Sequence, residues 1–299
     1  MSDEKMNAWL IYSDFESKRN KKYIEFYMEE GKKLDISIKL LIAEKIDIGV
    51  KDSKWFLSYK GEELLKPAFA ICRMMYPMLT THLENMGIRV YNNSFISDIC
   101  NDKAKTYQFV AKTKVAIVDT TFCKKEFITD KLELIPFPSV IKSTDGHGGT
   151  EVFLLEKKED IEVVLNSCHD KDVVIQPFVG KNHQDLRVYV IGNEIIAAVM
   201  RTAREGFKSN FCLGGEVSLY KLSSKEKDII YKIINLFKEN STYGFGFVGI
   251  DFIIGDQGEL LFNEIEDVVG SRMLYQCTDI NVVKLYLEFI RKNLLEFKD

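Results

Sequence analysis

Apolar and polar residues alternate along the first third of the chain in a pattern that predicts strands and helices in turn. Short apolar runs predict four strands, at residues 9–12, 35–43, 67–72 and 88–91. Residues 13–33 and the segment after Arg73 carry apolar residues at helical spacing. Strands that alternate with helices are typical of a parallel α/β domain, whose ligands bind beyond the carboxyl ends of the strands. Arg73 follows such a strand end and is therefore a candidate ligand for a substrate carboxylate, or else a surface or interface arginine.

The remaining two thirds of the chain contain more strand pairs and fewer crossovers. A polar helical segment is predicted at residues 94–113 and a shorter helix at 157–166. Strands are predicted at 114–119, 137–143 and 173–179, and a hairpin from 187–191 and 195–201 turns over Gly192-Asn193. Amphipathic helices are predicted at 223–239, with Ser223 or Ser224 as N-cap, and at 279–297.

Between those two helices lies a hairpin that carries three acidic residues. Its predicted strands, 247–254 and 259–266, are joined by Gly255-Asp256-Gln257-Gly258, which favours a tight turn. With Asp256 and Gln257 at the tip, Asp251 lies opposite Phe262, and Glu264 and Glu266 share its face. The other face is then apolar: Val248, Ile250, Phe252, Ile254, Leu261 and Ile265. A turn of odd length would flip one strand and separate the acids.

Three carboxylates on one face repel each other unless a cation or a basic partner lies among them. Oxygen ligands favour Mg²⁺ or Mn²⁺ over zinc. The alternative is a strand end whose acids only face water.

A glycine-rich turn lies upstream of the hairpin, between two predicted strands. Gly146, Gly148 and Gly149 follow Lys142 there, and backbone N–H groups in such a turn can approach phosphate oxygens closely. The segment matches neither a Walker loop, because the lysine precedes the glycines, nor a dinucleotide-binding fingerprint, because a strand follows. An ordinary hairpin is the alternative.

Two arginines in the 187–201 hairpin provide positive charge. With the turn centred between Gly192 and Asn193, Arg187 lies opposite Ala198 and Arg201 lies near Gln184. Both could project from one sheet face, either as ordinary strand arginines paired with acids or as one side of a metal–triphosphate site. The nearby His147 and His183 are interpreted as structural or solvent-facing residues, and no Ser/His/Asp or Cys/His nucleophile set is evident.

Composition narrows the class of protein. Of 299 residues 46% are hydrophobic and 29% charged, with a net charge of −4, which argues against disorder and against a nucleic-acid-binding surface over the whole protein. The 6 cysteines are scattered without C-x-x-C spacing, which favours reduced thiols and a cytoplasmic location. We find no secretory signal and no apolar run long enough for a membrane span, and the sequence leaves homo-oligomerisation open.

Taken together and in this order, the motifs resemble the ATP-grasp superfamily, specifically its RimK-like, glutathione-synthetase-like carboxylate–amine ligases. The resemblance covers residues 71–272. It is carried by Asn101-Asp102-Lys103, residues 138–142, Gly146-x-Gly148-Gly149, residues 176–179, Asp185-x-Arg187, Arg201, Asn210 with Gly214-Gly215, Gly249-Ile250-Asp251, and Asn263-Glu264-Ile265-Glu266.

The resemblance implies an α/β fold in three parts, with ATP clamped between two antiparallel sheets. The implied parts are an N-terminal α/β domain at 1–95, a central lid subdomain at 96–180 and a C-terminal catalytic subdomain at 181–299. It also implies roles. Nucleotide binding is implied for Lys103, Lys142, Gly146, Gly148, Gly149, Gln176, Pro177, Phe178, Val179 and Asp185, and phosphoryl binding for Arg187 and Arg201. Asp251, Glu264 and Glu266 would hold two Mg²⁺ ions, with Mn²⁺ as a substitute. Asn210 and Arg272, together with Arg73 at its strand end, are the predicted substrate contacts.

The implied reaction joins a carboxylate to an amine through an acyl-phosphate, with release of ADP and phosphate. Its substrates would be small molecules or peptides. One departure is Glu266, where the family usually has asparagine, and the loop 267–272 also differs from the usual small loop containing proline and glycine. Other classes of function remain open: a nucleotide-binding regulatory or scaffold protein on the same fold, and a phosphotransferase.

Overall fold

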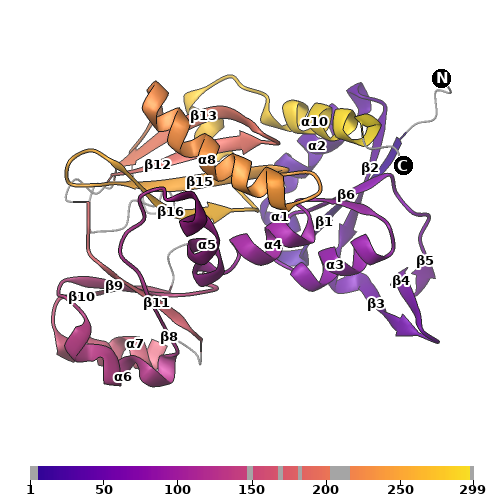
Figure 1. Ribbon diagram of the computed structural model, residues 1–299. Helices are drawn as coiled ribbons and strands as arrows, with labels where there is room; N and C mark the ends of the chain where they lie inside the picture. The colour runs from indigo at the N-terminus through magenta and orange to yellow at the C-terminus, as the bar shows by residue number, and fades with distance from the viewer. Residues whose placement is uncertain (1–5, 147–150, 168–170, 181–183, 203–215, 297–299) are drawn as a thin grey trace.

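The computed structural model describes residues 6–146, 151–167, 171–180, 184–202 and 216–296. Figure 1 shows an N-terminal domain beside a C-terminal sheet, with a smaller sheet set apart below them. No helix in these ranges is long and apolar enough to cross a membrane.

The N-terminal domain is built on a parallel sheet, as the alternating pattern predicts. Its strand order is β2 (Ile36–Ile42), β1 (Met6–Tyr12), β6 (Phe69–Cys72) and β7 (Arg89–Tyr91). The helices are α1 (Asp14–Arg19), α2 (Lys21–Lys33) and α3 (Pro77–Asn85). The last five residues of β1 and all of β6 are buried, because helices and neighbouring segments cover both faces of the sheet.

A small antiparallel sheet in this domain is missing from the predicted elements. It consists of β3 (Ile46–Lys51), β4 (Lys54–Tyr59) and β5 (Glu62–Glu63). Ile46, Ile48, Leu57 and Tyr59 alternate along these strands and face the domain core. Many charged residues lie between them, and Asp52 and Ser53 have positive φ in the turn, so the sequence shows no clear strand pattern here.

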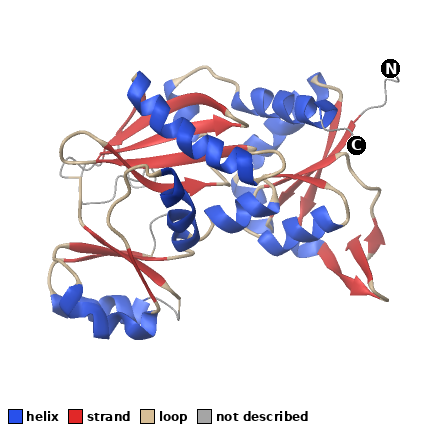
Figure 2. Ribbon diagram, in the orientation of Figure 1, coloured by secondary structure: helices blue, strands red, loops and turns tan. Residues whose placement is uncertain are grey.

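The central sheet has the order β10 (Val152–Leu155), β9 (Ser139–Ser143), β11 (Val173–Pro177) and β8 (Thr121–Cys123). Helices α6 (Ile128–Lys131) and α7 (Ile161–Ser167) cover one face of it, where Ile128, Ile141 and Val164 share a core (Figure 2). The strand predicted at 114–119 is wrong. Lys114 adopts positive φ there, and Ile117 makes only an isolated bridge to Phe262.

Two helices precede this sheet, where one polar helical segment was expected. They are α4 (Ser94–Cys100) and α5 (Lys103–Val110). They are separated at Asn101 and Asp102, and the Asp102 side chain caps α5 by accepting from the backbone N–H of Lys105.

The C-terminal sheet is antiparallel, in the order β14 (Glu216–Tyr220), β13 (Glu194–Thr202), β12 (Gln184–Ile191), β15 (Phe247–Ile254) and β16 (Leu260–Glu266). Helix α8 (Ser224–Asn240) covers one face of this sheet (Figure 1). Helices α9 (Arg272–Cys277) and α10 (Val282–Glu296) follow β16 in the chain, and α10 lies beside α2 of the N-terminal domain. The predicted N-cap of α8 is confirmed, since Ser223 and Glu226 form a capping box.

Strand alternation decides which side chains of this sheet can form a site. On β12, Leu186, Val188 and Val190 pack in the core that contains α8. The residues between them, including Arg187 and Tyr189, therefore project from the opposite face. Tyr189 joins a second core, shared with the N-terminal sheet and α10.

Bulges shift the register of both hairpins by one residue. In β12–β13 the predicted pairs are wrong: Arg187 lies opposite Val199 and Arg201 opposite Asp185, because the register shifts between Tyr189 and Val190. The shift leaves Arg187 and Arg201 on one face, as the sequence suggested.

In β15–β16 the register predicted from the turn is also wrong. The turn spans the odd number of residues from Gly255 to Glu259, so Phe252 pairs with Phe262, and Leu261 lies opposite Ile253 rather than on the apolar face. A bulge after this pair restores the alternation, and Asp251 lies opposite Glu264. The three acids consequently share a face, as predicted, although through a different pairing.

Candidate active site

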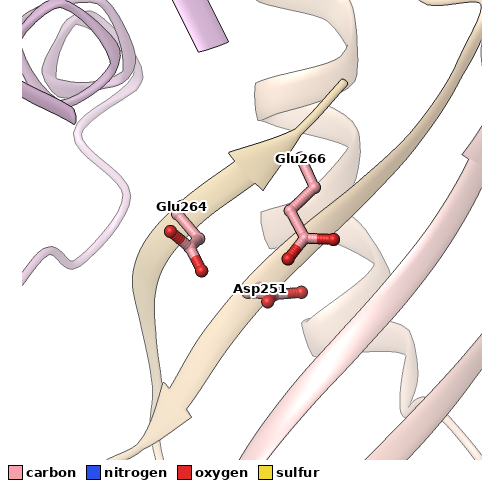
Figure 3. Close-up of side chains that lie close together, drawn as sticks. All are labelled: Asp251, Glu264 and Glu266. Atoms are coloured by element: carbon pink, nitrogen blue, oxygen red, sulfur yellow. The ribbon is translucent and has the colours of Figure 1, made fainter. Parts of the chain in front are cut away.

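The three acidic residues of the hairpin converge on one point. Asp251 comes from β15, and Glu264 and Glu266 come from β16, with their carboxylates turned toward a common space (Figure 3). One oxygen atom from each residue lies within 4.8 Å of the others. Asp251 is fully buried, whereas the side chains of Glu264 and Glu266 are 32% and 36% exposed. The cluster is thus anchored at the sheet and open on its outer side.

Both predicted arginines contact the buried member of this cluster. Arg187 donates from Nε and Nη2 to the two oxygens of Asp251 at 2.8 and 2.6 Å, and its Nη2 also lies 2.6 Å from Glu266 Oε1. Arg201 donates from Nη2 to Asp251 Oδ2 at 2.7 Å and from Nε to Asp185. Both guanidinium groups are buried, so these charge-assisted bonds fix them in place.

The environment separates the acid–base properties of neighbouring carboxylates. Burial acts to raise the pKa of Asp251, but Arg187 and Arg201 outweigh it and lower that pKa to about 2. The pKa of Glu266 is raised, first by burial and then by the charges of Asp251 and Glu264, while Arg187 acts in the opposite direction. The cluster therefore carries excess negative charge that a cation would stabilise.

Two lysines from the other side approach the hairpin. Lys142, on β9, donates from Nζ to Asn263 Oδ1 at 2.9 Å, and burial lowers its pKa to about 8. Lys103, the first residue of α5, donates to the carbonyl of Gly146, and its Nζ lies 3.9 Å from Glu264 Oε2. Cationic groups from the central sheet and α5 thus face the acids of the C-terminal sheet.

The predicted adenine-side residues lie on or just after β11. Gln176 is buried and donates from Nε2 to Thr120 Oγ1 at 2.8 Å. Pro177 ends the strand, the backbone N–H of Phe178 donates to the carbonyl of Pro138 at 2.9 Å, and Val179 follows before the chain enters the C-terminal sheet. This segment connects the two sheets, the position that a hinge requires.

The remaining predicted residues are distributed unevenly. Gly146 packs against Glu151, whose Oε2 would lie 2.9 Å from an added Cβ. Arg272 begins α9 and is exposed. Gly148, Gly149, Asn210, His147 and His183 lie outside the described residues.

Sequence reasoning missed the residues that hold the loop after Glu266. Asn92 donates from Nδ2 to the carbonyls of Asp267 and Phe247, at 2.6 and 3.1 Å, and accepts from the backbone N–H of Gly246 at 2.6 Å. Tyr189 donates to the carbonyl of Gly270 at 3.1 Å. These contacts join segments far apart in the chain, so no local pattern could have indicated them.

The donor set fits a hard divalent cation. All of its ligand atoms are carboxylate oxygens, the kind that Mg²⁺ prefers. Arg187 Nη2 bridges Asp251 and Glu266, so part of the positive charge between the acids comes from this side chain. Asp251, Glu264 and Glu266 are therefore the residues that would hold the metal.

Comparison with known proteins places the chain in a family. A model of the RimK-like ATP-grasp domain matches residues 100–290. An uncharacterised protein, MG011 of Mycoplasma genitalium, is 31% identical over 201 residues, which is 67% of this chain and 66% of that protein. A probable alpha-L-glutamate ligase of Coxiella burnetii is 27% identical over 273 residues, covering 87% of this chain and 88% of the relative.

Solved structures share the fold. The RimK domain protein ATP-grasp from Sphaerobacter thermophilus superposes with a TM-score of 0.71 at 16% identity, covering 95% of this chain and 98% of that one. The ATP-grasp ligase PsnB, solved with minimal precursor, Mg and ADP, gives a TM-score of 0.67 at 14% identity, covering 98% and 99%. The fold, the order of the motifs and the family match agree: this chain belongs to the RimK-like ATP-grasp family.

Proposed function

We propose that the chain is an ATP- and Mg²⁺-dependent ligase that joins a carboxylate to an amine through an acyl-phosphate. The observation that carries the proposal is the pairing of three converging carboxylates with two buried arginines on one sheet face, opposite Lys103 and Lys142. A triphosphate bound with a metal needs both negative ligands for the metal and positive ligands for its oxygens.

The proposal assigns each group of residues a task. Lys103, Lys142 and the glycine turn that begins at Gly146 bind the phosphates, and residues 176–179 together with Asp185 belong to the nucleotide side of the site. Asp251, Glu264 and Glu266 would hold two magnesium ions, which would supply positive charge for the phosphate oxygens. Manganese would satisfy the same oxygen donors.

Arg187 and Arg201 stabilise the γ-phosphoryl group of ATP while it is transferred. The substrate carboxylate attacks the γ-phosphorus of ATP, the bond to the bridging oxygen breaks, and ADP leaves with that oxygen. Charge on the equatorial oxygens is offset by the guanidinium groups, whose position is preset by Asp251 and Asp185.

The second half of the reaction needs no protein nucleophile. The amine attacks the acyl carbon of the acyl-phosphate, an amide bond forms, and inorganic phosphate leaves with the bonding electrons of the acyl–oxygen bond and takes up the proton that the amine loses. Positioning and exclusion of water carry this step, because water would otherwise hydrolyse the acyl-phosphate. Asn210 and Arg272 are assigned to the substrate side.

L-Glutamate is the first substrate to test. Support comes from the relative in Coxiella burnetii, described as a probable alpha-L-glutamate ligase, whose similarity extends over 87% of this chain. The partner substrate would be a small-molecule or peptide carboxylate or amine.

The test is a screen for stimulated ADP release. The protein is incubated with ATP, Mg²⁺ and L-glutamate, paired with other amino acids, short peptides and small carboxylic acids, and products are identified by mass spectrometry. We expect at least one pair to release ADP and phosphate in equal amounts with a product lighter by one water than the summed substrates. Nucleotide binding without ADP release by any pair would instead indicate a regulatory nucleotide-binding protein.

A further inference from the structure

The small antiparallel sheet of the N-terminal domain has one open edge. Strand β3 pairs with β4 on one side, and no strand in the described ranges pairs with its other side. Helix α3 lies over a face of this sheet and not along that edge. Its Leu79 shares a core with Leu57 of β4. The Nε2 atom of His82 lies 2.8 Å from the backbone carbonyl oxygen of Phe56, which is also on β4.

Strand β3 has none of the features that usually prevent an edge strand from pairing. It contains no proline, and its pairing with β4 runs without a bulge from Ile46 to Lys51. A regular strand with unpaired backbone groups on one side is a surface on which a further strand can add.

Apolar side chains are exposed where this hairpin ends. Val50 on β3 is 65% exposed, and Trp55, opposite it on β4, is 54% exposed. The next residue, Phe56, is 40% exposed on the other face. Figure 1 shows the hairpin projecting from the N-terminal domain at an end of the molecule away from the central sheet. Isolated apolar residues are normal on a surface, but three neighbours on one projecting hairpin indicate a contact surface.

The turn decides which backbone groups of β3 point to the open edge. Residues 52–53 both have positive φ, as in a two-residue type I′ turn, so Lys51 and Lys54 flank the turn as a hydrogen-bonded pair. Backbone groups alternate in direction along an antiparallel strand. The N–H and C=O groups of Ile48 and Val50 therefore point to the open edge.

The side chains of β3 are complementary to those of a second β3 in reverse direction. Asp47 and Lys51 are exposed on the same face, about 13 Å apart along the strand, too far to pair with each other. In an antiparallel pairing about a two-fold axis at Gly49, Asp47 lies opposite Lys51 of the second copy, and the reverse pair forms by symmetry. The same register places Val50 opposite Ile48 on the other face, as a hydrogen-bonded pair. An axis at Ile48 or Val50 would separate the opposite charges.

Gly49 also suits the position on the axis. An added Cβ there would lie 2.7 Å from Cε1 of Phe56, so the aromatic ring lies beside the glycine on the exposed face. Two glycines facing each other across the axis would leave room for the Phe56 rings of both copies, which would then cover each other.

We propose that the chain forms a two-fold symmetric homodimer in which the β3 strands of two copies pair antiparallel about Gly49. The two small sheets become one continuous sheet, and each copy contributes the same surface, as in other two-fold interfaces. The proposal does not rest on the ligase function. The hairpin lies apart from the acid cluster, so each copy keeps its own site (Figure 1).

The experiment is analytical ultracentrifugation of the full chain over a range of protein concentrations. We expect the wild type to be a dimer that dissociates on dilution. Asp47→Lys should raise the Kd of the dimer about tenfold or more, because lysine then faces Lys51 on both sides of the axis. Glu63→Lys is the matched control, since it makes the same change of charge on β5, at the other edge of the sheet. It should dimerise as the wild type does.

Reversing both charges tests the register. Lys51→Asp alone should weaken the dimer as Asp47→Lys does, and the variant with both substitutions should return the Kd to within about threefold of the wild-type value. Both positions are exposed, so the variants should keep the fold. A monomer at all concentrations, or a dimer that the single variants do not weaken or the double variant does not restore, overturns the proposal.

Hydrogen exchange of the wild type gives a test that needs no variant. The backbone N–H groups of Ile48 and Val50 should exchange slowly in the dimer and much faster after dilution to the monomer, because their hydrogen-bond partners are on the second copy. Fast exchange of both N–H groups in a dimeric sample would place the interface elsewhere and overturn the proposal.

Discussion

Replacing Asp251 with asparagine tests whether the buried carboxylate has two roles, one in stability and one in metal binding. Asp251 is fully buried and accepts three hydrogen bonds from Arg187 and Arg201. Its pKa falls from the ordinary 3.8 to about 2. At about 1.4 kcal/mol for each tenfold change, this favours the ionised form in the folded state by about 2 kcal/mol. Removing one partner of a buried ion pair costs about 3 to 5 kcal/mol in other proteins.

The asparagine side chain of this variant would keep one acceptor oxygen, while Glu266 and Asp185 still contact the two arginines. We therefore expect Asp251→Asn to lower the free energy of unfolding by about 2 to 4 kcal/mol, measured by urea denaturation near pH 7. The pKa of Asp251 is lower in the folded state than in the unfolded state. The ionised carboxylate therefore adds its full share to the free energy of unfolding of the wild type above pH 3.8, and this share is lost as the pH falls toward 2.

Glu264→Gln is the matched comparison. Glu264 is partly exposed, and its nearest described cation, Lys103, is 3.9 Å away, so the variant should lose less than about 1 kcal/mol. Both variants should lose Mg²⁺-dependent ADP release. Equal stability of Asp251→Asn and wild type would refute the argument from the buried pair. Near-normal turnover in Glu264→Gln would remove that residue from the metal site.

Two further predictions concern nucleotide binding and domain contact. Burial lowers the pKa of Lys142 to about 8, and bound phosphates would raise it again, so nucleotide binding at pH 8 should take up a fraction of a proton, detected by calorimetry in buffers of different ionisation enthalpy. Lys142→Ala should abolish this uptake and weaken ATP binding; unchanged affinity, or proton release in the wild type at pH 8, would count against it. Asn92→Ala removes three buried hydrogen bonds and should lower the free energy of unfolding by roughly 2 to 4 kcal/mol, whereas Asn240→Ala, at an exposed helix end, should change it by less than about 0.5 kcal/mol. A similar urea midpoint for both asparagine variants would show that Asn92 is not a structural contact.

Local patterns were sufficient for most elements and for the residues of the acid cluster. The parallel sheet, the acid hairpin and α8 follow from apolar spacing and from turn and cap residues that act over a few positions. The strand expected at 114–119 failed because Val115 and Ile117 pack in the core of the C-terminal sheet while the chain there stays irregular, apart from one bridge. A run of buried apolar residues looks the same in a sequence whether the chain forms a paired strand or packs as irregular chain.

The registers could not be obtained from the sequence because both bulges are set by tertiary packing. No residue near Ile196 or Asn263 indicates an extra position in the strand. Yet these extra positions decide that Arg201 lies opposite Asp185 and that Asp251 lies opposite Glu264. Long-range contacts such as those of Asn92, and that of Arg73 with the backbone carbonyl of Val269, were equally hidden, since their partners lie more than a hundred residues away.

The bulged residue Asn263 constrains how this hairpin can change during evolution. It supplies the position that compensates an odd-length turn, and its side chain also accepts the hydrogen bond from Lys142, which joins the two sheets. Deleting this residue would remove the bulge and still leave Glu264 opposite Asp251, but Lys142 would lose its acceptor on the C-terminal sheet. Natural variants without the bulge should therefore keep the three acids on one face and carry another acceptor for the lysine.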